Sequence, residues 1–427
     1  MHVSTHTWPG RRPKQAARPG FPLNARPCPL CGGLTADKLA EMDYVMFDGC
    51  CLERPLCMLV CHDCGLVYNE INDPSSLTRY YTEQAAYGDL DLGSGSGFDS
   101  PLDRRRYGRS YEALAPFLAG PETRIIDLGC AKGGFLFYLR DQGFTDLTGV
   151  DLSRPCLDHL AAHGFGALFG GAEHIPLPDS SVDMVYSSNL FEHIYDLAAA
   201  AREVGRVLRP GGLFLVETPD SMDYDGCCLK GYQWLLPEHI NFLSRAHLEE
   251  LLKLTGFSIL GSGPNRLYYS ENHYQPQAYA LGRKAGTALR VGGRAGHSVA
   301  PRPLREQISR RLVEDAGRLA KAKNLVDLLA AEGRSLFLWG LGWTFNFYYA
   351  QLDWSRSEIK ALVDRRTSIQ NCRFGGREVR GLEALAEAGP DDAVLALATH
   401  SAGMKAYLAE TNCRARFFDL IGGWEAN

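Results

Sequence analysis

The chain has 427 residues, a length that typically holds about three domains. Hydrophobic residues make up 45% and charged residues 22%, a composition typical of a folded globular protein. The formal net charge of −5 speaks against an extended nucleic-acid-binding surface, and no apolar run approaches the roughly 20 residues that span a bilayer. Thirteen cysteines without a secretion signal indicate a reducing compartment and a metal rather than disulfides. We therefore expect a cytoplasmic protein.

Residues 1–27 are basic and contain several prolines but no acidic residue. They lack the apolar centre of a signal peptide. We predict a disordered tail, with a nucleic-acid-binding arm as the alternative. Its charged residues are Arg11, Arg12, Lys14, Arg18 and Arg26.

Two Cys-x-x-Cys pairs, Cys28–Cys31 and Cys61–Cys64, predict a zinc-binding domain over residues 28–98. Four thiolates form a closed tetrahedral site without a position for water, so the zinc is expected to be structural. Short strands are expected within 34–59 and at 65–68. The alternative function is a redox dithiol. A neighbouring side chain could also replace one of the four cysteines as a zinc ligand. These neighbours are Cys50, Cys51, Cys57 and His62.

A glycine- and serine-rich run at 91–97 follows this domain. Such a run is typical of a flexible loop. We expect either a mobile cover for a ligand site in the next domain or a plain linker.

Residues 125–134, followed by 148–151, predict a buried strand, a glycine turn, a helix and a second strand ending in an acid. Gly129 and Gly133 allow the backbone to bend and to approach a ligand. Asp151 occupies the position where an α/β nucleotide site binds ribose hydroxyls. Asp127 would repel a pyrophosphate but attract an ammonium group, which favours an amino-acid-containing nucleotide over a dinucleotide.

This pattern resembles the glycine loop of class I S-adenosylmethionine (SAM) methyltransferases, Asp/Glu-x-Gly-x-Gly-x-Gly, with Ala131 at the middle glycine. Further segments resemble the same family in the same order, at 171–178, 181–194 and 206–217, with Gly171 where the family usually has Asp. The resemblance implies a SAM-dependent methyltransferase domain over residues 99–280. It implies that SAM is bound by Asp127, Gly129, Cys130, Ala131, Gly133, Asp151, Leu152, Ala172, Glu173 and Asn189.

A segment rich in Gly, Ala and Arg at 281–302 marks a boundary, and residues 303–427 repeat the nucleotide-fold theme. A helical pattern at 304–331 precedes a strand that enters a glycine turn at Gly340, and a second strand ends at Asp364. Phe345 replaces the third glycine of a dinucleotide motif. We predict a degenerate Rossmann-like α/β domain that packs on the preceding domain or helps to hold a nucleotide-linked substrate, without a working NAD site.

The three-part layout resembles the C-methyltransferases of nucleotide-linked deoxy-keto-sugars. Residues 237–244 are similar to that family's His-Glu-His-x-x-Tyr-Phe-Ser segment, with Pro237 at its first position, and 265–270 stand where the family has Gly-Gly-Ser. Zinc-headed methyltransferases of polysaccharide and natural-product pathways fit about equally. The resemblance implies an α/β class I methyltransferase fold between a zinc domain and a Rossmann-like domain. It also implies a nucleotide-linked keto-sugar as substrate.

Methylation of carbon requires a base that removes a proton next to a ketone, and histidine is well suited to this task. Our hypothesis is that His239 is the base and that Glu238 orients it, with a loop-anchoring role as the alternative. The pair Glu192–His193 is the rival. We expect the acceptor pocket to contain Tyr80, Tyr81 and Tyr87.

Three other classes stay open at the level of sequence. The first is methyl transfer to a hydroxyl or amine, for which the same histidines could serve as base. The second is an RNA methyltransferase with an N-terminal zinc module. The third is a non-catalytic protein that binds SAM through the same glycine loop. The sequence predicts neither the acceptor nor the oligomeric state.

Overall fold

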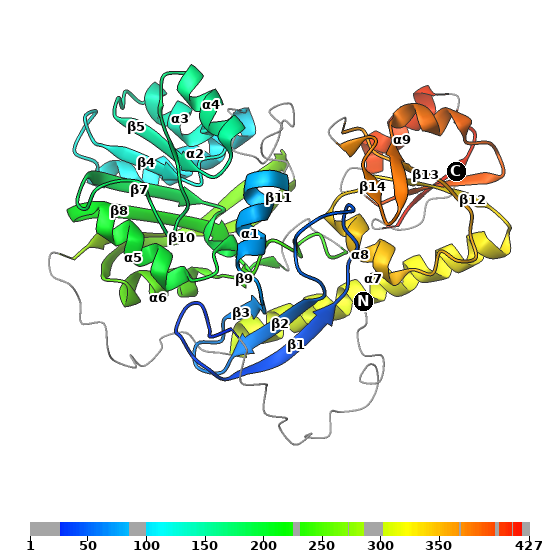
Figure 1. Cartoon of the computed structure of the whole chain (residues 1–427), viewed down its shortest axis with the longest axis horizontal. Coiled ribbons are helices and arrows are strands. Elements are labelled where there is room, and N and C mark those ends of the chain that lie inside the picture. The colour runs from blue at the N-terminus through cyan, green and yellow to red at the C-terminus, as the bar shows by residue number, and fades with distance from the viewer. Residues whose placement is uncertain are drawn as a thin grey trace.

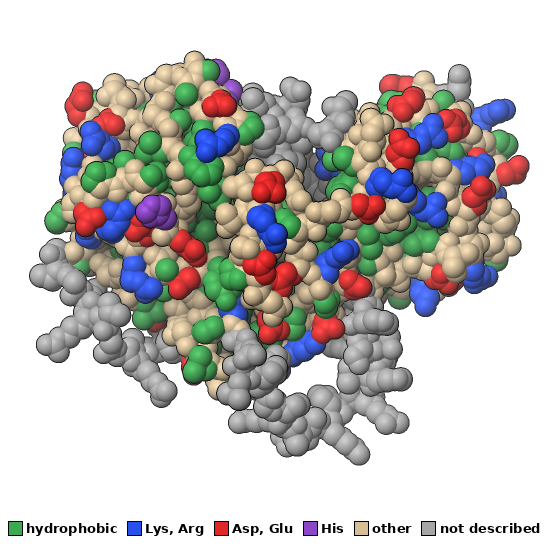
Figure 2. Space-filling view, viewed as in Figure 1, with side chains coloured by type: hydrophobic (Ala, Val, Ile, Leu, Met, Phe, Trp, Pro, Cys, Tyr) green, Lys and Arg blue, Asp and Glu red, His purple; other side chains and the backbone are tan. Residues whose placement is uncertain are grey.

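The computed structural model describes residues 26–84, 100–224, 231–271, 273–285, 302–366, 369–397, 401–411 and 413–420. The predicted glycine-serine loop at 91–97 and Tyr87 lie outside these residues. The described residues form three sheets. Figure 1 shows the seven-stranded sheet at the left, the third sheet at the right, and the four-stranded sheet below them, beside the long helix α7 (Arg302–Ala331). Figure 2 shows acidic and basic side chains interspersed over the face in view. Among the described helices, none combines the length and apolar character needed to cross a membrane.

The first sheet is antiparallel and has the order β1-β2-β3-β9. Three of its strands come from the cysteine-rich segment, as the sequence predicts, but the fourth comes from the segment that contains His239. The four strands are β1 (Ala36–Met42), β2 (Leu56–Cys61), β3 (Val67–Asn69) and β9 (Asn241–Phe242). The short helix α1 (Ser75–Arg79) and a π-helical turn at Tyr80–Gln84 follow β3.

The second sheet has seven strands in the order β10-β11-β8-β7-β4-β5-β6. The strands from β4 to β8 are parallel, whereas β11 runs antiparallel to both of its neighbours, β8 and β10. Its strands are β4 (Ile125–Leu128), β5 (Leu147–Asp151), β6 (Gly166–Phe169), β7 (Val182–Ser188), β8 (Leu208–Pro219), β10 (Phe257–Ser270) and β11 (His273–Lys284).

Helices cover both faces of this sheet. Alternate residues of its strands point to opposite faces and belong to two separate apolar clusters, one on each face. Residues of α2, α3 and α4 belong to one cluster, and residues of α5 and α6 to the other. These helices are α2 (Pro101–Leu114), α3 (Gly134–Asp141), α4 (Arg154–Ala162), α5 (Leu197–Val207) and α6 (Arg245–Leu254). Short 3₁₀ turns lie at Ala115–Phe117 and Phe191–His193.

The third sheet has the order β14-β15-β13-β12-β16-β17 and is parallel except for β14. Its strands are β12 (Ser335–Trp339), β13 (Ile359–Val363), β14 (Arg373–Phe374), β15 (Arg377–Arg380), β16 (Asp392–Ala396) and β17 (Arg416–Asp419). Its helices are α7 (Arg302–Ala331), α8 (Trp343–Gln351) and α9 (Ser401–Glu410), with a 3₁₀ turn at Leu382–Glu387. The Rossmann-like pattern predicted for this part of the chain is therefore present.

The ribose-binding position of this third unit is occupied by the protein itself. Asp364 accepts a hydrogen bond of 2.8 Å from the backbone N–H of Leu341, and its two carboxylate oxygens also pair with the Arg366 guanidinium at 2.9 and 3.0 Å. Burial acts to raise the pKa of Asp364, but the interactions with Arg366 and with backbone N–H groups outweigh it, so the pKa is lowered and the carboxylate stays ionised. These contacts agree with the prediction of a degenerate nucleotide fold.

A single apolar core joins the first sheet to the third unit through α7. Met58 of β2, Ile308 of α7 and Phe345 of α8 all belong to it. Asp315, buried on α7, accepts hydrogen bonds from the backbone N–H groups of Gly231 and Tyr232 and from Trp234 Nε1, at 2.7–3.0 Å. The long helix therefore anchors the segment that leads to His239.

Arg26 corrects the predicted extent of the N-terminal tail. The sequence assigns it to the disordered residues, but its side chain is only 4% exposed and donates to three carbonyl groups of two other segments. The positive charge of Arg26 suggested exposure to solvent. In the structure, backbone carbonyl groups accept hydrogen bonds from the buried guanidinium instead.

Candidate metal centre and active site

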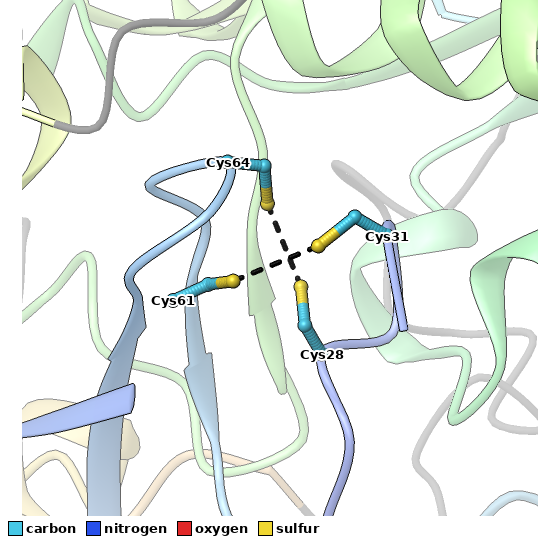
Figure 3. A group of neighbouring side chains, drawn as sticks. All are labelled: Cys28, Cys31, Cys61 and Cys64. Atoms are coloured by element: carbon cyan, nitrogen blue, oxygen red, sulfur yellow. Dashed lines mark hydrogen bonds between the residues drawn. The ribbon is translucent and has the colours of Figure 1, made fainter. Parts of the chain in front are cut away.

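The four cysteines of the two Cys-x-x-Cys pairs converge on one point. Cys28 and Cys31 lie in a turn before β1, Cys61 ends β2, and Cys64 lies in the turn that follows. The Sγ atoms of Cys28 and Cys64 are 3.5 Å apart, those of Cys31 and Cys61 are 3.6 Å apart, and all four lie within 4.8 Å of one another (Figure 3). A tetrahedral zinc site with Zn–S bonds of about 2.3 Å has sulfur–sulfur distances of about 3.8 Å. The residues therefore fit a zinc ion.

The alternative ligands in this region have other partners. Cys51 Sγ donates to the Ser76 carbonyl at 3.3 Å, and His62 pairs with Asp37 at 2.8 Å. The group of metal-competent side chains found here consists only of the four nominated cysteines, among the residues that the structure describes.

A cavity of about 780 Å³ opens at the carboxyl ends of the parallel strands of the seven-stranded sheet. Nine of the ten nominated SAM residues line it, and Gly133 is the exception. Gly133 has a φ of +75° just before α3, and a Cβ there would lie 2.2 Å from Leu160 Cδ2. It is therefore a packing glycine, and Gly134 reaches the cavity in its place.

Hydrogen bonds connect the glycine turn to Asp151. Asp151 accepts hydrogen bonds of 2.8 Å from the backbone N–H groups of Ala131 and Ser153. Ala131 has a φ of +44°, a left-handed conformation that costs a non-glycine residue about 1 kcal/mol or more. The departure from the family glycine thus places mild strain in the turn, and the bond to Asp151 holds that turn in place.

A carboxyl group, that of Asp127, and a buried cation, Arg106, both line the cavity. Burial and the neighbouring Asp151 raise the pKa of Asp127 to about 8, against the opposing field of Arg106. Arg106 is 4% exposed and donates to Ser188 Oγ and to Tyr107 Oη, both at 3.3 Å. The sequence did not reveal Arg106, because nothing local distinguishes it from the two arginines that precede it on α2.

The structure brings the two rival histidines together. His193 ends a 3₁₀ turn after β7, His239 precedes β9, and their ring centroids are 4.6 Å apart at 76°. His193 Nδ1 lies 2.9 Å from the backbone carbonyl of Glu238, which can only accept, so Nδ1 carries the proton. The Tyr81 hydroxyl lies 2.7 Å from the same nitrogen. The backbone of Glu238 therefore orients His193, whereas no hydrogen bond joins the Glu238 carboxyl group to the His239 ring.

Burial sets the protonation of this cluster. It lowers the pKa of His193 to about 4, against hydrogen bonds to backbone groups, and burial together with His193 lowers the pKa of His239 well below its usual value. Burial also raises the pKa values of Glu192 and Glu238 to about 8. At neutral pH the histidines are neutral and can accept a proton.

Glu192, His193 and His239 also place one potential ligand atom each within 4.8 Å of one another. Both carboxyl oxygens of Glu192 are buried without a hydrogen-bond partner. A metal requires deprotonated ligands, and burial favours the protonated carboxyl group. A bound cation would reverse this preference, so the three groups suit either proton transfer or a metal ion.

All three units contribute to the histidine end of the cavity. Leu77 and Tyr81 come from the segment after the first sheet, Leu236 comes from the segment before His239, and Trp343 begins α8 of the third unit. Tyr80 does not line the cavity but packs against Tyr81, with ring centroids 5.2 Å apart. Trp343 was missed because an aromatic residue at a helix start is typical of core packing.

A seven-stranded sheet of this order, with a glycine turn and an acid at the ends of adjacent strands, defines the central unit as a Rossmann-like α/β methyltransferase fold. This confirms the fold class that the sequence predicts. Residues 90–261 match the family model described as a methyltransferase domain. The central unit therefore resembles methyltransferase domains in both its fold and its sequence.

Proteins similar to this chain are also named as methyltransferases. A probable S-adenosylmethionine-dependent methyltransferase of Mycolicibacterium smegmatis is 34% identical over 158 residues, which cover 36% of this chain and 59% of the relative. A malonyl-[acyl-carrier protein] O-methyltransferase of Serratia marcescens is 38% identical over 102 residues, which cover 23% and 39%. The chain thus spans about three-fifths or less of the length of these curated relatives. A solved SAM-dependent methyltransferase from Mesorhizobium loti has a TM-score of 0.36 and 22% identity, and the match covers 43% of this chain and 100% of that one.

Proposed function

We propose that the chain transfers the methyl group of SAM to a small molecule that binds at the histidine end of the cavity. The observation that carries this proposal is the continuity of the cavity. One wall contains the SAM residues around Asp151, and another contains Tyr81, His193 and His239. Bound SAM supplies an electrophilic methyl group, and the protein must align the acceptor behind it and exclude water.

The acceptor that we favour is a carbon of a nucleotide-linked keto-sugar in a polysaccharide or natural-product pathway. Removal of a proton next to the ketone needs a neutral base, and His239, buried on the cavity wall, meets this requirement. Trp343 gives the third unit a direct contact with the acceptor end. This contact is consistent with a substrate that carries a second moiety, such as a nucleotide, toward that unit.

An oxygen acceptor is the second candidate. The Serratia marcescens relative is named as an O-methyltransferase, and a neutral imidazole can equally accept the proton of a hydroxyl group. The two candidates differ in whether a C–H bond of the acceptor becomes labile.

For the four cysteines we propose a structural zinc ion. Four thiolates fill the coordination sphere and leave no position for a substrate. The ion would tie the turn before β1 to the turn after β2 and so close the first sheet.

A calorimetric titration with S-adenosylhomocysteine (SAH), followed by a panel of nucleotide-linked keto-sugars, tests the proposal. The protein should bind SAH, and at least one sugar nucleotide should bind to the SAH complex. In D₂O this complex should exchange the proton next to the ketone, because no methyl group is available to trap the carbanion. SAH binding with a sugar that binds but shows no exchange would move the reaction to oxygen, and absence of SAH binding would refute the methyltransferase assignment.

SAH binding is also expected to release a proton at pH 7. With a pKa of about 8, Asp127 is about nine-tenths protonated in the free protein. The ammonium group of SAH favours the ionised carboxylate and lowers this pKa, so the proton leaves on binding, and affinity should rise with pH up to about 8. Calorimetry in buffers of different ionisation enthalpy measures the release, and Asp127→Asn should remove it. An unchanged release in that variant would assign the proton to another group.

A further inference from the structure

A buried polar network connects the metal centre to the active site, and Arg26 lies at its middle. Arg26 precedes Cys28 by two residues. Its Nη1 donates to the Asn69 carbonyl at 3.0 Å, and its Nη2 donates to the carbonyls of Ile194 and Tyr195. The guanidinium also lies over the Tyr195 ring, 4.4 Å from its centroid. One side chain thus ties the cysteine turn to the segment directly after His193.

Asn69 makes the corresponding connection to His239. It ends β3, and its Nδ2 donates to the His239 carbonyl at 3.1 Å. Its backbone N–H donates to the Ile240 carbonyl at 2.8 Å, next to the pairing of β3 with β9. The backbone on both sides of the His239 peptide is therefore held by a strand of the cysteine-rich unit.

Four further hydrogen bonds close the network between the histidine segments. Asn241 Nδ2 donates to the carbonyls of Phe191 and Ile194 at 3.1 and 2.8 Å, and its Oδ1 accepts from Arg26 at 3.3 Å. The Ile240 N–H donates to the Glu192 carbonyl at 2.8 Å. The segments that carry the two histidines are thus joined to each other and to the metal-binding unit.

We propose that Arg26 and Asn69 are positioning residues that hold His193 and His239 face to face, so that the folded zinc unit sets the geometry of the proton-transfer site. This inference rests on the proposed function, because it assigns the two histidines to the acceptor end. Among the described residues, the glycine turn of the SAM wall has no such contact with the cysteine-rich unit. The turn at Ala131 is held by Asp151 of its own sheet.

Hydrogen exchange of the zinc-loaded full chain tests the inference without an acceptor. Arg26→Ala should raise amide exchange about tenfold or more over 190–195 and 239–242, because charge-assisted bonds to buried carbonyls are lost. Exchange in β4 and β5 should stay unchanged, and SAH affinity should stay within about twofold. Asn69→Ala should loosen 239–242 more than 190–195.

Arg140→Ala is the matched control. Arg140 also donates to a backbone carbonyl, that of His163 at 2.9 Å, and lies 4.4 Å from the Phe165 centroid, but it connects α3 with α4. It should leave both histidine segments protected. Unchanged exchange in Arg26→Ala would overturn the inference, and so would equal loosening of β4 and β5, which would make Arg26 a residue of the general fold.

Chemical rescue separates positioning from bulk packing. Low, non-denaturing guanidinium should restore protection of 190–195 and 239–242 in Arg26→Ala, whereas sodium at equal ionic strength should not. Protection that sodium restores equally would contradict a specific guanidinium role. Failure of the wild-type chain to bind SAH would instead count against the proposed function, since the exchange pattern does not depend on it.

Discussion

Removal of the proposed zinc ion is expected to abolish the structure of the first sheet and to lower the thermal midpoint by more than any single packing substitution. Apparent binding free energies of structural zinc sites are about 10–16 kcal/mol, comparable to the whole stability of a domain. The Cys61→Ser variant should therefore lose its zinc and fold poorly. Elemental analysis, thiol titration and thermal unfolding measure these effects, and wild-type protein should contain one zinc per chain.

Cys57→Ser provides the matched control for this prediction. Cys57 lies in the same strand, β2, and is half-buried, but it is not part of the four-cysteine cluster. It should keep one zinc and a near-normal midpoint. Full zinc content in Cys61→Ser would refute the assigned ligands. A second equivalent that survives in Cys61→Ser and disappears in Glu192→Gln would place an ion at the histidine cluster.

Local motifs led to the nominated SAM and metal residues, and the structure gathers the four cysteines into one cluster and nine of the ten SAM residues around one cavity. Asp127 and Asp151 end adjacent parallel strands, and the cysteine pairs each span a single turn, so short-range spacing is sufficient to bring these groups together. Gly133 shows the limit of this reasoning. A Cβ there would lie 2.2 Å from Leu160 Cδ2, so packing alone is sufficient to require a glycine.

The residues that sequence reasoning missed or left as alternatives depend on tertiary packing. His193 and His239 seemed to be rivals because they lie far apart in the chain, and only tertiary contacts between their segments, such as the hydrogen bond from the Ile240 N–H to the Glu192 carbonyl, bring them together. Arg26 and Arg106 carry charge, which usually indicates exposure, yet the fold surrounds both with buried acceptors. Trp343 reaches the cavity only because α7 places the third unit beside it.

The largest effect on turnover is expected from His239→Asn, with a loss of about 10²–10⁴-fold in kcat, the usual contribution of a general base. Asparagine keeps the polar shape but cannot accept a proton from an acceptor at neutral pH. SAH affinity should change by less than about twofold, because the SAM wall lies apart from this ring. Methyl transfer to a sugar nucleotide from the binding screen measures the loss, and His163→Asn, a substitution of an exposed histidine, should be neutral.

The pH dependence of the wild-type enzyme supplies the decisive comparison. Burial lowers the pKa values of both histidines, to about 4 for His193, so the base stays neutral and, at saturating SAM, kcat/KM for the acceptor should hold constant well below the ordinary histidine pKa of about 6.5. It should fall only as the pH approaches the lowered values, because protonation then removes the acceptor lone pair. Near-normal kcat in His239→Asn, combined with loss of activity in His193→Asn, would transfer the base role to His193. In that case the carbonyl of Glu238, which fixes the His193 tautomer, would orient the base through the peptide backbone.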